Sequence, residues 1–410
     1  MNIASRIYCR AVQSVFRAAL PILPYRQPKP LSGTQQIAPL LRRKKIRSIL
    51  LIVDAGVRRL GLTAALEESL LNEHIVFTVY EQHTPNPTIA DVERARAQYQ
   101  LSNAKAIVTV GGGSAMDCAK VVGARIARPK RQVSSMRGLL RVMRPTPLLI
   151  AVPTTAGTGS ETTLTAVITD GNTHHKYPIN DFALIPDYAV LDASLTLGLP
   201  PKITASTGMD ALTHAVEAYI GRSTTRFTRR MAERAIVLIA QNLRLAYANG
   251  NNHDARENML RASYCAGLAF TRSYVGYVHG IAHSLGGQYG IAHGLANAVI
   301  LPKVLRRYGS ACEKKFAHLA LIAGIVPKGT QDSDAALRFI HWIEEMNREF
   351  GFQTGFSQIR EEDISLMALH ADKECNPLYP VPKLMDRREL EAIYHELTCK
   401  EEPRCALKAS

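Results

Sequence analysis

The sequence lacks the features of a disulfide-bonded protein and of a membrane-spanning one. Its seven cysteines are odd in number, scattered along 410 residues, and never paired as CxxC. They therefore indicate neither a disulfide framework nor a cysteine metal site, and a reducing cytoplasm is the expected location. No stretch approaches the roughly 18 consecutive apolar residues that a transmembrane helix needs.

Acidic residues are nearly missing from two parts of the chain. Residues 1–50 contain ten Lys or Arg and no acid, and residues 101–150 contain nine with Asp117 alone against them. These blocks carry net charges of +10 and +8, so the rest of the chain is slightly acidic within the total of +15. A basic block can bind nucleic acid or an anionic membrane, or it can be a solvated face near an anionic cofactor. Because no nucleic-acid fold signature accompanies the charge, we expect no nucleic-acid partner.

The first twenty residues have the pattern of a basic amphipathic helix. Apolar residues recur at helical spacing between Arg6, Arg10 and Arg17, and Pro21 is expected to stop the helix. The arginines interrupt the apolar run and no cleavage site follows, so we do not expect a signal peptide. Two interpretations are open, namely contact with an anionic membrane and packing against its own chain or a subunit partner. We favour the second.

Short apolar runs alternate with helical segments from residue 48 onward, which indicates a parallel sheet covered by helices. Helical periodicity dominates after about residue 195. We therefore predict a basic extension over residues 1–34, an α/β domain over 35–195, and an all-helical domain over 196–410. The expected strands are SILLIVD, IVFTVY, AIVTV and PLLIAV.

The usual GxGxxG fingerprint is absent after the first strand, but glycines 111–113 stand between an expected strand and an expected helix. They allow close approach of the backbone to a ligand, and the helix start near Ser114 offers free N–H groups to a pyrophosphate. Asp117, in the first helical turn, is placed to cap the helix or to accept a hydrogen bond from a ribose. A plain tight turn is the alternative.

Two further strand ends carry ligand-binding residue types. Asp54 follows the first strand, where an acid can hold an adenosine ribose and repel a 2′-phosphate, although an N-cap role is also open. The run 154–159 supplies hydroxyls and glycines after the strand PLLIAV. Two phosphate-binding loops favour a dinucleotide over a mononucleotide.

Candidate metal ligands stand in the helical half. Asp210 and His214 are four residues apart and share one helix face, as do His279 and His283. With His293, they offer mixed nitrogen and oxygen donors for a divalent ion. Each histidine alone is more often a hydrogen-bonded core residue, so the combination carries the prediction.

A straight helix would carry His293 about 21 Å from His279, too far to share a ligand. The glycine-rich run 286–290 removes this difficulty, because it allows the chain to leave the helix after Leu285 and turn back. A glycine turn between two helices is the plain structural alternative.

Four separated motifs then identify a family. GGGSAMDCAK, PTTAGTGSETT, GMDALTHAVEAY and HGIAHSLGGQYGIAHGLANAV occur in this order and closely resemble the iron-containing (group III) alcohol dehydrogenases over about residues 35–398. The resemblance implies the dehydroquinate synthase-like fold, with a Rossmann-like dinucleotide-binding α/β domain before an all-α domain. It also implies a homodimer. The basic extension lies outside the family core, so the resemblance gives it no role.

The resemblance also implies roles for individual residues. Fe²⁺ is the metal most often used in the family, with Zn²⁺ in some members, and Asp54 favours NAD over NADP. His283 is expected near the metal without ligating it, as a catalytic proton relay. His174 and His175 are expected to be exposed turn residues and not ligands. The implied metal ligands are Asp210, His214, His279 and His293, and the implied cofactor contacts are Asp54, Asn86, Gly112, Gly113, Ser114, Asp117, Thr154, Thr155, Thr163 and Lys176.

The expected reaction is hydride transfer between a small alcohol and a nicotinamide, with the metal as Lewis acid on the substrate oxygen. Two enzyme alternatives share the scaffold, a zinc-dependent polyol dehydrogenase and a dehydroquinate synthase-like lyase. A membrane-associated binding protein that uses the basic amino end is the alternative from another class. The physiological substrate cannot be derived from the sequence.

Overall fold

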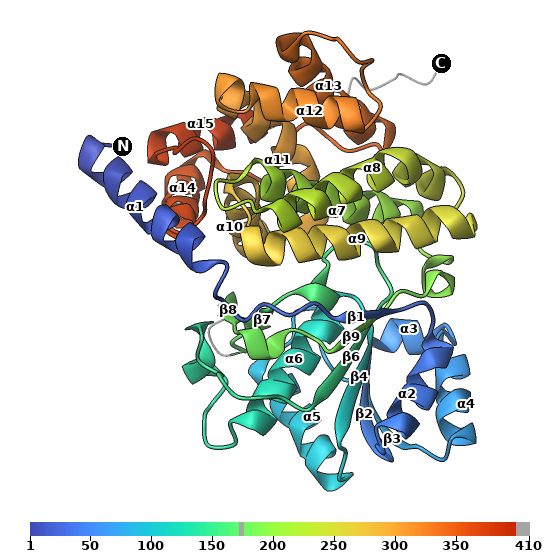
Figure 1. Ribbon diagram of the computed structural model, residues 1–410. Helices are drawn as coiled ribbons and strands as arrows, with labels where there is room; N and C mark the ends of the chain where they lie inside the picture. The colour runs from blue at the N-terminus through green and yellow to red at the C-terminus, as the bar shows by residue number, and fades with distance from the viewer. Residues whose placement is uncertain (172–175, 399–410) are drawn as a thin grey trace, which may run out of the picture. The chain divides into compact units, whose positions relative to one another are not determined.

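The computed structural model describes residues 1–171 and 176–398, in which a parallel α/β region precedes a helical region, as the sequence predicts (Figure 1). The chain divides into two compact units. The sheet unit contains Ile22–Ala215 and Arg230–Arg272. The C-terminal unit contains Met1–Pro21, Val216–Arg229 and the residues from Ser273 onward. The predicted domain limits at residues 34 and 195 stay a prediction.

Six parallel strands form the main sheet, in the order β1-β9-β6-β4-β2-β3. The four expected strands are confirmed as β2, β3, β4 and β6, while the short edge strand β1 was not predicted. Its two exposed residues and single half-buried one give no apolar run. The strands are β1 (Lys29–Leu31), β2 (Ser48–Val53), β3 (Val76–Tyr80), β4 (Ala106–Gly111), β6 (Leu148–Pro153) and β9 (Tyr188–Val190).

Alternate residues of the central strands supply two cores, one on each face of the sheet. In β2, Leu50 and Ile52 pack with α5 and α6, whereas Ile49 and Leu51 pack with α2 and α4 (Figure 1). All four are fully buried. The helices of the sheet's two faces are α2 (Ile37–Arg43), α3 (Ala55–Arg59), α4 (Ala64–Asn72), α5 (Ile89–Leu101) and α6 (Gly113–Ala127).

A second, three-stranded sheet follows the order β5-β8-β7 and packs its apolar residues into the core that holds α5 and α6. Its strands are β5 (Gly138–Leu139), β7 (Thr165–Thr169) and β8 (Lys176–Asn180).

Helices make up the rest of the described chain. Helix α7 (Pro201–Ile220) is continuous across the division between the two units, since residues to Ala215 belong to the sheet unit and those from Val216 to the C-terminal unit. The other helices after it are α8 (Arg226–Ala248), α9 (His253–Ser273), α10 (Tyr277–Tyr289), α11 (His293–Tyr308), α12 (Glu313–Ile322), α13 (Asp332–Glu349), α14 (Glu361–Cys375) and α15 (Arg387–Leu397).

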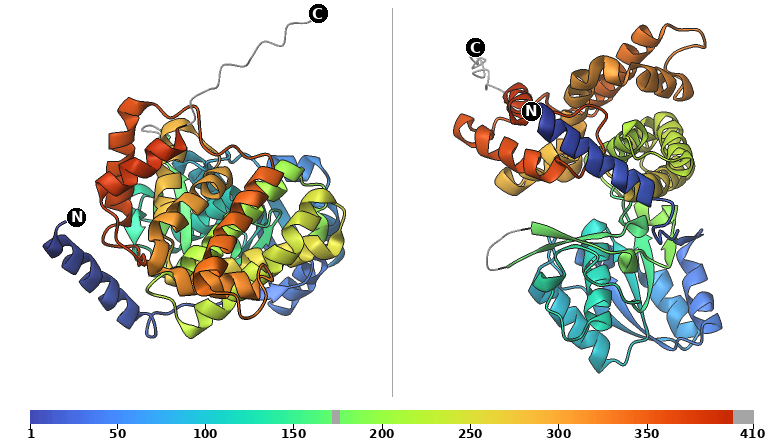
Figure 2. Two further views of the ribbon diagram at one scale, coloured as in Figure 1. Left: turned by 90° about the horizontal axis from the view of Figure 1, so that it is seen from above. Right: turned by 60° about the vertical axis from the view of Figure 1, so that its left-hand side comes forward.

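The predicted amino-terminal helix is α1 (Ile3–Ala19), and its cap residue Leu20 stands directly before Pro21. It packs on its own C-terminal unit through the buried side chains of Cys9 and Gln13 (Figures 1 and 2). This packing agrees with the interpretation favoured from the sequence, in which the helix contacts its own chain and not a membrane. Among the described residues, none of the helices combines the length and apolar character needed to cross a membrane.

Candidate active site

The carboxyl ends of β2, β4 and β6 lie side by side in the sheet, and the predicted cofactor-binding segments follow them directly. The backbone N–H of Asp54 donates to Val110 across β2 and β4 (3.1 Å), and that of Thr154 donates to Gly111 across β6 and β4 (3.0 Å). The strand order reverses between β2 and β4, and ligands of such sheets bind at this kind of switch point. The structure therefore brings Asp54, the glycine loop (residues 111–113) and the second loop (residues 154–159) to one edge of the sheet.

Asp54 fulfils the capping role that the sequence left open, because its carboxylate accepts from the N–H of Gly56 (2.9 Å) at the start of α3. The glycine loop is tightly packed beside it. A Cβ at Gly111 would lie 2.7 Å from Ala115 and 3.2 Å from Asp54, and one at Gly113 would lie 3.2 Å from Thr158. At Gly112 the nearest atom would be the Thr155 hydroxyl at 3.9 Å, an ordinary van der Waals contact, so this glycine is less crowded than its two neighbours.

Helix α6 begins at Gly113, and no side chain of the described residues caps its amino end. The hydroxyl of Ser114 in its first turn donates to the carbonyl of Pro85, which ties the helix start to the segment that carries the exposed Asn86. The next residue of that segment, Pro87, accepts from Thr169 N (2.9 Å). Thr169 in turn pairs in β7 with the exposed Lys176 at the start of β8. The segments that carry Asn86 and Lys176 are thus linked by the hydrogen bond between Thr169 and Pro87.

Asp117 is held by protein groups on both carboxylate oxygens. The Ser160 hydroxyl donates to one oxygen and the Val167 N–H to the other, each at 3.0 Å. Burial raises the pKa of Asp117, and the nearby Lys120 and these two hydrogen bonds lower it in part. Asp117 therefore links α6 to Ser160, the residue directly after the run 154–159, and to β7.

Lys120 is a buried cation that the sequence analysis did not single out. Its Nζ donates to the hydroxyls of Ser160 (3.0 Å) and Thr163 (2.7 Å) and to the Thr165 carbonyl (2.8 Å). Burial lowers its pKa to about 8. The buried Glu161 beside it has a pKa that burial raises to about 7. One of the three predicted cofactor threonines, Thr163, thus accepts a hydrogen bond from a buried ammonium group.

Helix α7 carries Asp210 and His214 on one face, four residues apart, and both are buried. The imidazole of His214 stacks on Phe270 with ring centroids 4.1 Å apart and an interplanar angle of 12°. This stacking fixes the plane of a predicted ligand.

Three histidines meet in the C-terminal unit. His279 and His283 lie one turn apart on α10, and His293 is the first residue of α11. The His293 ring centroid lies 5.4 Å from that of His279 and 5.3 Å from that of His283. The predicted return of His293 toward His279 is therefore observed.

The turn that returns His293 differs from the one expected. The chain does not leave the helix after Leu285, because α10 continues to Tyr289 and ends at the left-handed Gly290 (φ +68°). Gly286 and Gly287 are ordinary helical residues. Glycine permits a turn without requiring one, and only Gly290 has the backbone angle for which a side chain is costly.

Glu217 and Asn297 hold the metal-ligand candidates, and the sequence analysis missed both. Glu217 is buried and accepts from the N–H groups of Gly276 (2.8 Å) and Val278 (2.9 Å), and its Oε2 lies 2.6 Å from His279 Nδ1. Since a carboxylate only accepts, Nδ1 carries the proton and Nε2 keeps its lone pair. The Asn297 amide nitrogen lies 3.2 Å from this Nε2 and 3.1 Å from Nε2 of His293, so both lone pairs face one point.

His283 has a different set of contacts. Its side chain is 44% exposed, and its Nδ1 lies 2.6 Å from Oε1 of Glu374 on α14. The Tyr379 hydroxyl donates to the same oxygen (2.7 Å). Burial raises the pKa of Glu374, but His283 and the Tyr379 hydroxyl outweigh it, and the net shift is downward. An ionised carboxylate thus orients the histidine that is predicted to move protons.

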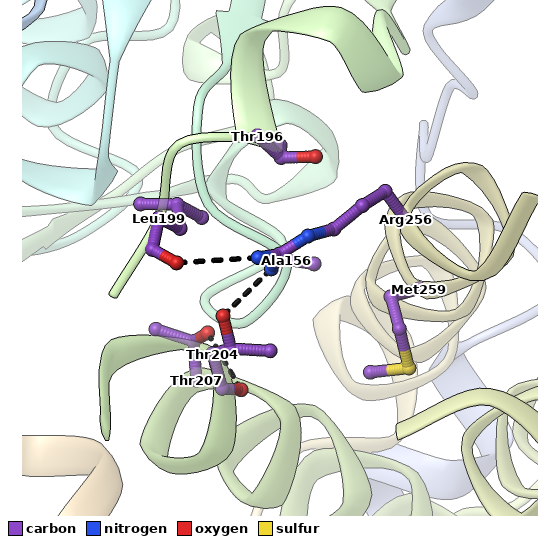
Figure 3. Close-up of a pocket in the computed structure, with 7 residues that line it drawn as sticks. All are labelled: Ala156, Thr196, Leu199, Thr204, Thr207, Arg256 and Met259. Carbon is purple, nitrogen blue, oxygen red and sulfur yellow. Dashed lines mark hydrogen bonds between the residues drawn. The ribbon is translucent and has the colours of Figure 1, made fainter. Parts of the chain in front are cut away.

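The sheet unit also contains a cavity of about 10 Å³, lined in part by Ala156 of the second loop (Figure 3). Its size fits about one water molecule, so it is no substrate pocket. The buried Arg256 crosses it and donates to the Thr204 hydroxyl (2.6 Å) and the Leu199 carbonyl (3.2 Å). This arginine fixes the start of α7, the helix that carries Asp210 and His214.

Comparison with known proteins decides the family. A model described as iron-containing alcohol dehydrogenase matches residues 32–193, and one described as Fe-containing alcohol dehydrogenase family, C-terminal, matches residues 204–398. A 1,3-propanediol dehydrogenase from Citrobacter freundii is 37% identical over 386 residues, which are 93% of this chain and 98% of the relative. The chain belongs to the iron-containing alcohol dehydrogenase family.

Two further relatives of this iron-type dehydrogenase agree. An NAD-dependent methanol dehydrogenase from Bacillus methanolicus is 35% identical over 341 residues, which are 83% of this chain and 89% of the relative. A solved structure of a 1,3-propanediol oxidoreductase superposes with a TM-score of 0.87 at 35% identity, over 91% of this chain and 99% of that one. The predicted family, fold and enzyme class are therefore confirmed. The protein is an oxidoreductase, and neither the lyase nor the binding-protein alternative gains support.

Three of the dehydrogenase residues that sequence reasoning missed have a common property. Lys120, Glu217 and Glu374 each contact a predicted site residue that is distant in sequence, by 43, 62 and 91 positions. Lys120 and Glu217 also had a local signal, since each lies three residues after a predicted site residue on the same helix, Asp117 and His214 respectively. The predicted turn residues His174 and His175 lie outside the described residues.

Proposed function

We propose that this alcohol dehydrogenase interconverts a small alcohol and the corresponding aldehyde or ketone, with NAD as hydride carrier and a divalent ion, Fe²⁺ or Zn²⁺. The observation that carries the proposal is the convergence of two imidazole nitrogens. Nε2 of His279 and Nε2 of His293 face the same amide of Asn297, and Glu217 fixes the first ring from behind. A carboxylate behind a histidine is the usual support of a metal ligand.

Helix α7 supports Asp210 and His214 as the other two ligands. Residues 210, 214 and 217 share one face of a continuous helix, since they are spaced by four and three positions. Glu217 on this face contacts His279. We therefore propose that Asp210, His214, His279 and His293 bind one ion. Three imidazoles and one carboxylate suit both Fe²⁺ and Zn²⁺, so the donor set leaves the metal open between these two.

The switch point of the sheet supports a dinucleotide site. The N–H groups at the start of α6, which no described side chain caps, suit a pyrophosphate, and the lack of a side chain at Gly112 allows its approach. Asp54 at the end of β2 suits a ribose and disfavours a 2′-phosphate, which supports NAD over NADP. We propose that residues 35–195 bind the cofactor and residues 196–410 hold the metal. The proposed contacts are Asp54, Asn86, Gly112, Gly113, Ser114, Asp117, Thr154, Thr155, Thr163 and Lys176.

When bound, the ion polarises the substrate oxygen as a Lewis acid and the nicotinamide takes or gives the hydride. The residues of the chain handle the proton. Nδ1–H of His283 donates to Glu374, which leaves Nε2 as the proton acceptor. The exposed part of the ring can then release the proton to water. His283 thus serves as a relay between the substrate hydroxyl and solvent.

The cysteines and the family resemblance support proposals for the location and the assembly of the enzyme. The five described cysteines are free and buried, as in proteins of a reducing compartment, so we propose a cytoplasmic enzyme. The homodimer stays a proposal drawn from the family resemblance. We propose small alcohols, diols and aldehydes as substrates because the relatives are named for methanol and 1,3-propanediol.

Metal reconstitution tests the proposed function. The purified enzyme is stripped with a chelator, loaded with Fe²⁺ or Zn²⁺, and assayed by NADH absorbance on primary alcohols, diols and aldehydes. We expect metal-dependent turnover and a preference for NAD over NADP. Turnover that is unaffected by complete metal removal would overturn the metal assignment.

Three histidine variants separate the proposed roles. We expect His279→Ala and His293→Ala to lose the ion in elemental analysis. His283→Ala should keep the ion and lose turnover, most visibly in the pH profile. His341→Ala, at an exposed position of α13, serves as the matched control and should change neither. A fully metallated His279→Ala protein, or unchanged rates in His283→Ala, contradicts the corresponding role.

A further inference from the structure

Helix α1, drawn in blue, lies beside the red helices of the C-terminal unit (Figure 2). Its side chains donate to backbone carbonyls of the segment between α14 and α15. The Arg10 guanidinium donates to Val381 (2.7 Å) and Pro382 (2.9 Å). The Gln13 amide donates to Tyr379 (2.7 Å) and Pro377 (3.3 Å). Four carbonyls within six residues are thus satisfied by two side chains of one helix.

The sequence of this segment explains why it needs outside donors. Residues 376–386 form no helix or strand, and prolines at 377, 380 and 382 lack an N–H. The segment therefore has few backbone donors for its own carbonyls, and the Tyr379 carbonyl accepts from Val381 N–H (2.8 Å) in addition to Gln13. Gln13 is only 3% exposed, and Arg10 also donates to its side-chain oxygen (2.7 Å), which fixes the amide orientation.

Aromatic contacts add an apolar part to the same attachment. Phe16 of α1 meets Tyr274 edge to face with ring centroids 4.9 Å apart. Tyr274 lies next to Tyr379, with ring centroids 6.4 Å apart. The attachment therefore reaches the Tyr379 ring as well as its backbone.

Tyr379 connects this attachment to the proposed proton relay. Its carbonyl accepts from Gln13, and its hydroxyl donates to Oε1 of Glu374 (2.7 Å). The same oxygen lies 2.6 Å from Nδ1 of His283. A shift of the segment would thus move the hydroxyl, the carboxylate and the imidazole together.

We propose that α1 is a positioning element of the dehydrogenase: through Gln13 and Arg10 it holds Tyr379, and through Tyr379 it holds Glu374 against His283. This inference rests on the proposed role of His283. Both family models begin after α1, at residues 32 and 204, so the role is not inherited from the matched regions. Arg10 and Gln13 touch no predicted ligand or cofactor residue among their described contacts, and act only through the segment.

The test compares Gln13→Ala and Arg10→Ala with Arg6→Ala, an exposed position on the same helix. Turnover is measured with NAD and 1,3-propanediol on the metal-loaded full-length enzyme. We expect kcat to fall about tenfold in the first two variants, with KM and metal content nearly unchanged, because a displaced proton relay slows the chemical step. Arg6→Ala should retain the parent kcat.

A double variant separates positioning from general loss of structure. If Gln13 acts through Tyr379, then Gln13→Ala in a Tyr379→Phe background should lower kcat little further. Two independent falls that multiply would overturn the proposal, as would unchanged kcat in both single variants. Thermal unfolding of each variant identifies a folding defect.

The outcome also distinguishes this inference from the proposed function. Unchanged turnover in both His283→Ala and Tyr379→Phe removes the relay itself. Reduced turnover in these two variants, with no effect of Gln13→Ala and Arg10→Ala, removes only the role of α1.

Discussion

Glu217 shows how one buried side chain can determine the chemistry of its neighbour. Its carboxylate accepts from two backbone N–H groups and from His279 Nδ1, and burial raises its pKa to about 7. The amide variant Glu217→Gln keeps the size but removes the full negative charge behind the imidazole. We expect the affinity for Zn²⁺ to fall about 10- to 100-fold, as measured by competition with a chromophoric chelator.

Glu344→Gln is the control for this measurement, because Glu344 pairs with Arg306 on the exposed side of α13. It should leave Zn²⁺ affinity unchanged. Equal affinities in Glu217→Gln and the parent would show that the carboxylate does not support the ligand.

Glu161 permits a prediction about stability and pH. Burial raises its folded pKa from 4.5 to about 7, so the protonated form is the one that folding favours. Its contribution to stability is complete below pH 4.5 and is lost as pH rises through 7. Because Glu161→Gln stays neutral, its stability relative to the parent should increase over this range, by on the order of 2 kcal/mol.

Urea unfolding at pH 5, 6, 7 and 8 measures this difference. Glu68→Gln removes an exposed carboxylate of α4 and should follow the parent at every pH. A Glu161→Gln protein whose stability difference from the parent is the same at pH 5 and pH 8 would contradict the assignment.

At the scale of elements, the α10–α11 turn depends on one glycine. Gly290 has φ +68°, whereas Gly287 is helical and exposed, with nothing within 4 Å of an added Cβ. Gly290→Ala should lower the free energy of unfolding by about 1 kcal/mol, because a side chain is strained there. Gly287→Ala should raise it by about 0.5–1 kcal/mol.

Urea midpoints of the two variants test this contrast, and zinc content adds a second measurement. Because Gly290 lies three residues before His293, we expect Gly290→Ala to lower zinc occupancy and Gly287→Ala to leave it unchanged. Equal stability of the two glycine variants would show that the turn does not require the left-handed residue.

The longer elements could be predicted from sequence, and the reasons are visible in the structure. Strand β2 has five consecutive buried residues, and the segments around it alternate with helices of regular periodicity. Strand β1 has three residues and no apolar run, so its pairing with β9 depends on contacts that sequence periodicity does not carry. The exact end of α10 was missed because glycine is compatible with both helix and turn.

The candidate site was predictable only as far as its motifs extend. The histidines and Asp210 stand within short recognisable stretches. Glu374 lies outside these stretches and reaches His283 across 91 positions, and Lys120, although it ends the stretch GGGSAMDCAK, reaches Thr163 across 43. Only the packed structure brings such pairs together, because neither partner constrains the local sequence of the other.

At the scale of the whole molecule, the proposed ion should stabilise the fold. An ion that binds only the native state adds about 2.7 kcal/mol at a free concentration 100 times its dissociation constant. Thermal unfolding of the metal-free enzyme should therefore shift upward when Zn²⁺ is added. Asp210→Asn should lose most of this shift, because it removes the only carboxylate among the proposed ligands.

Asp254→Asn is the matched control for the unfolding experiment. Asp254 belongs to an exposed group with His253 and Glu257 on α9, which could take up Zn²⁺ without any catalytic role. It should retain the full shift. If Asp254→Asn loses the shift in unfolding temperature and Asp210→Asn keeps it, the stabilising ion binds at the α9 group and not at the proposed catalytic site.

The attachment of α1 has a consequence for how this enzyme can change during evolution. The helix contributes neither a proposed ligand nor a proposed cofactor contact, so mutations in it leave the chemistry of the site intact. They can still alter how firmly Tyr379 is held. Selection on residues 1–21 can therefore adjust catalytic rate separately from substrate preference, which makes this terminal segment a place to seek natural or laboratory variants with changed turnover.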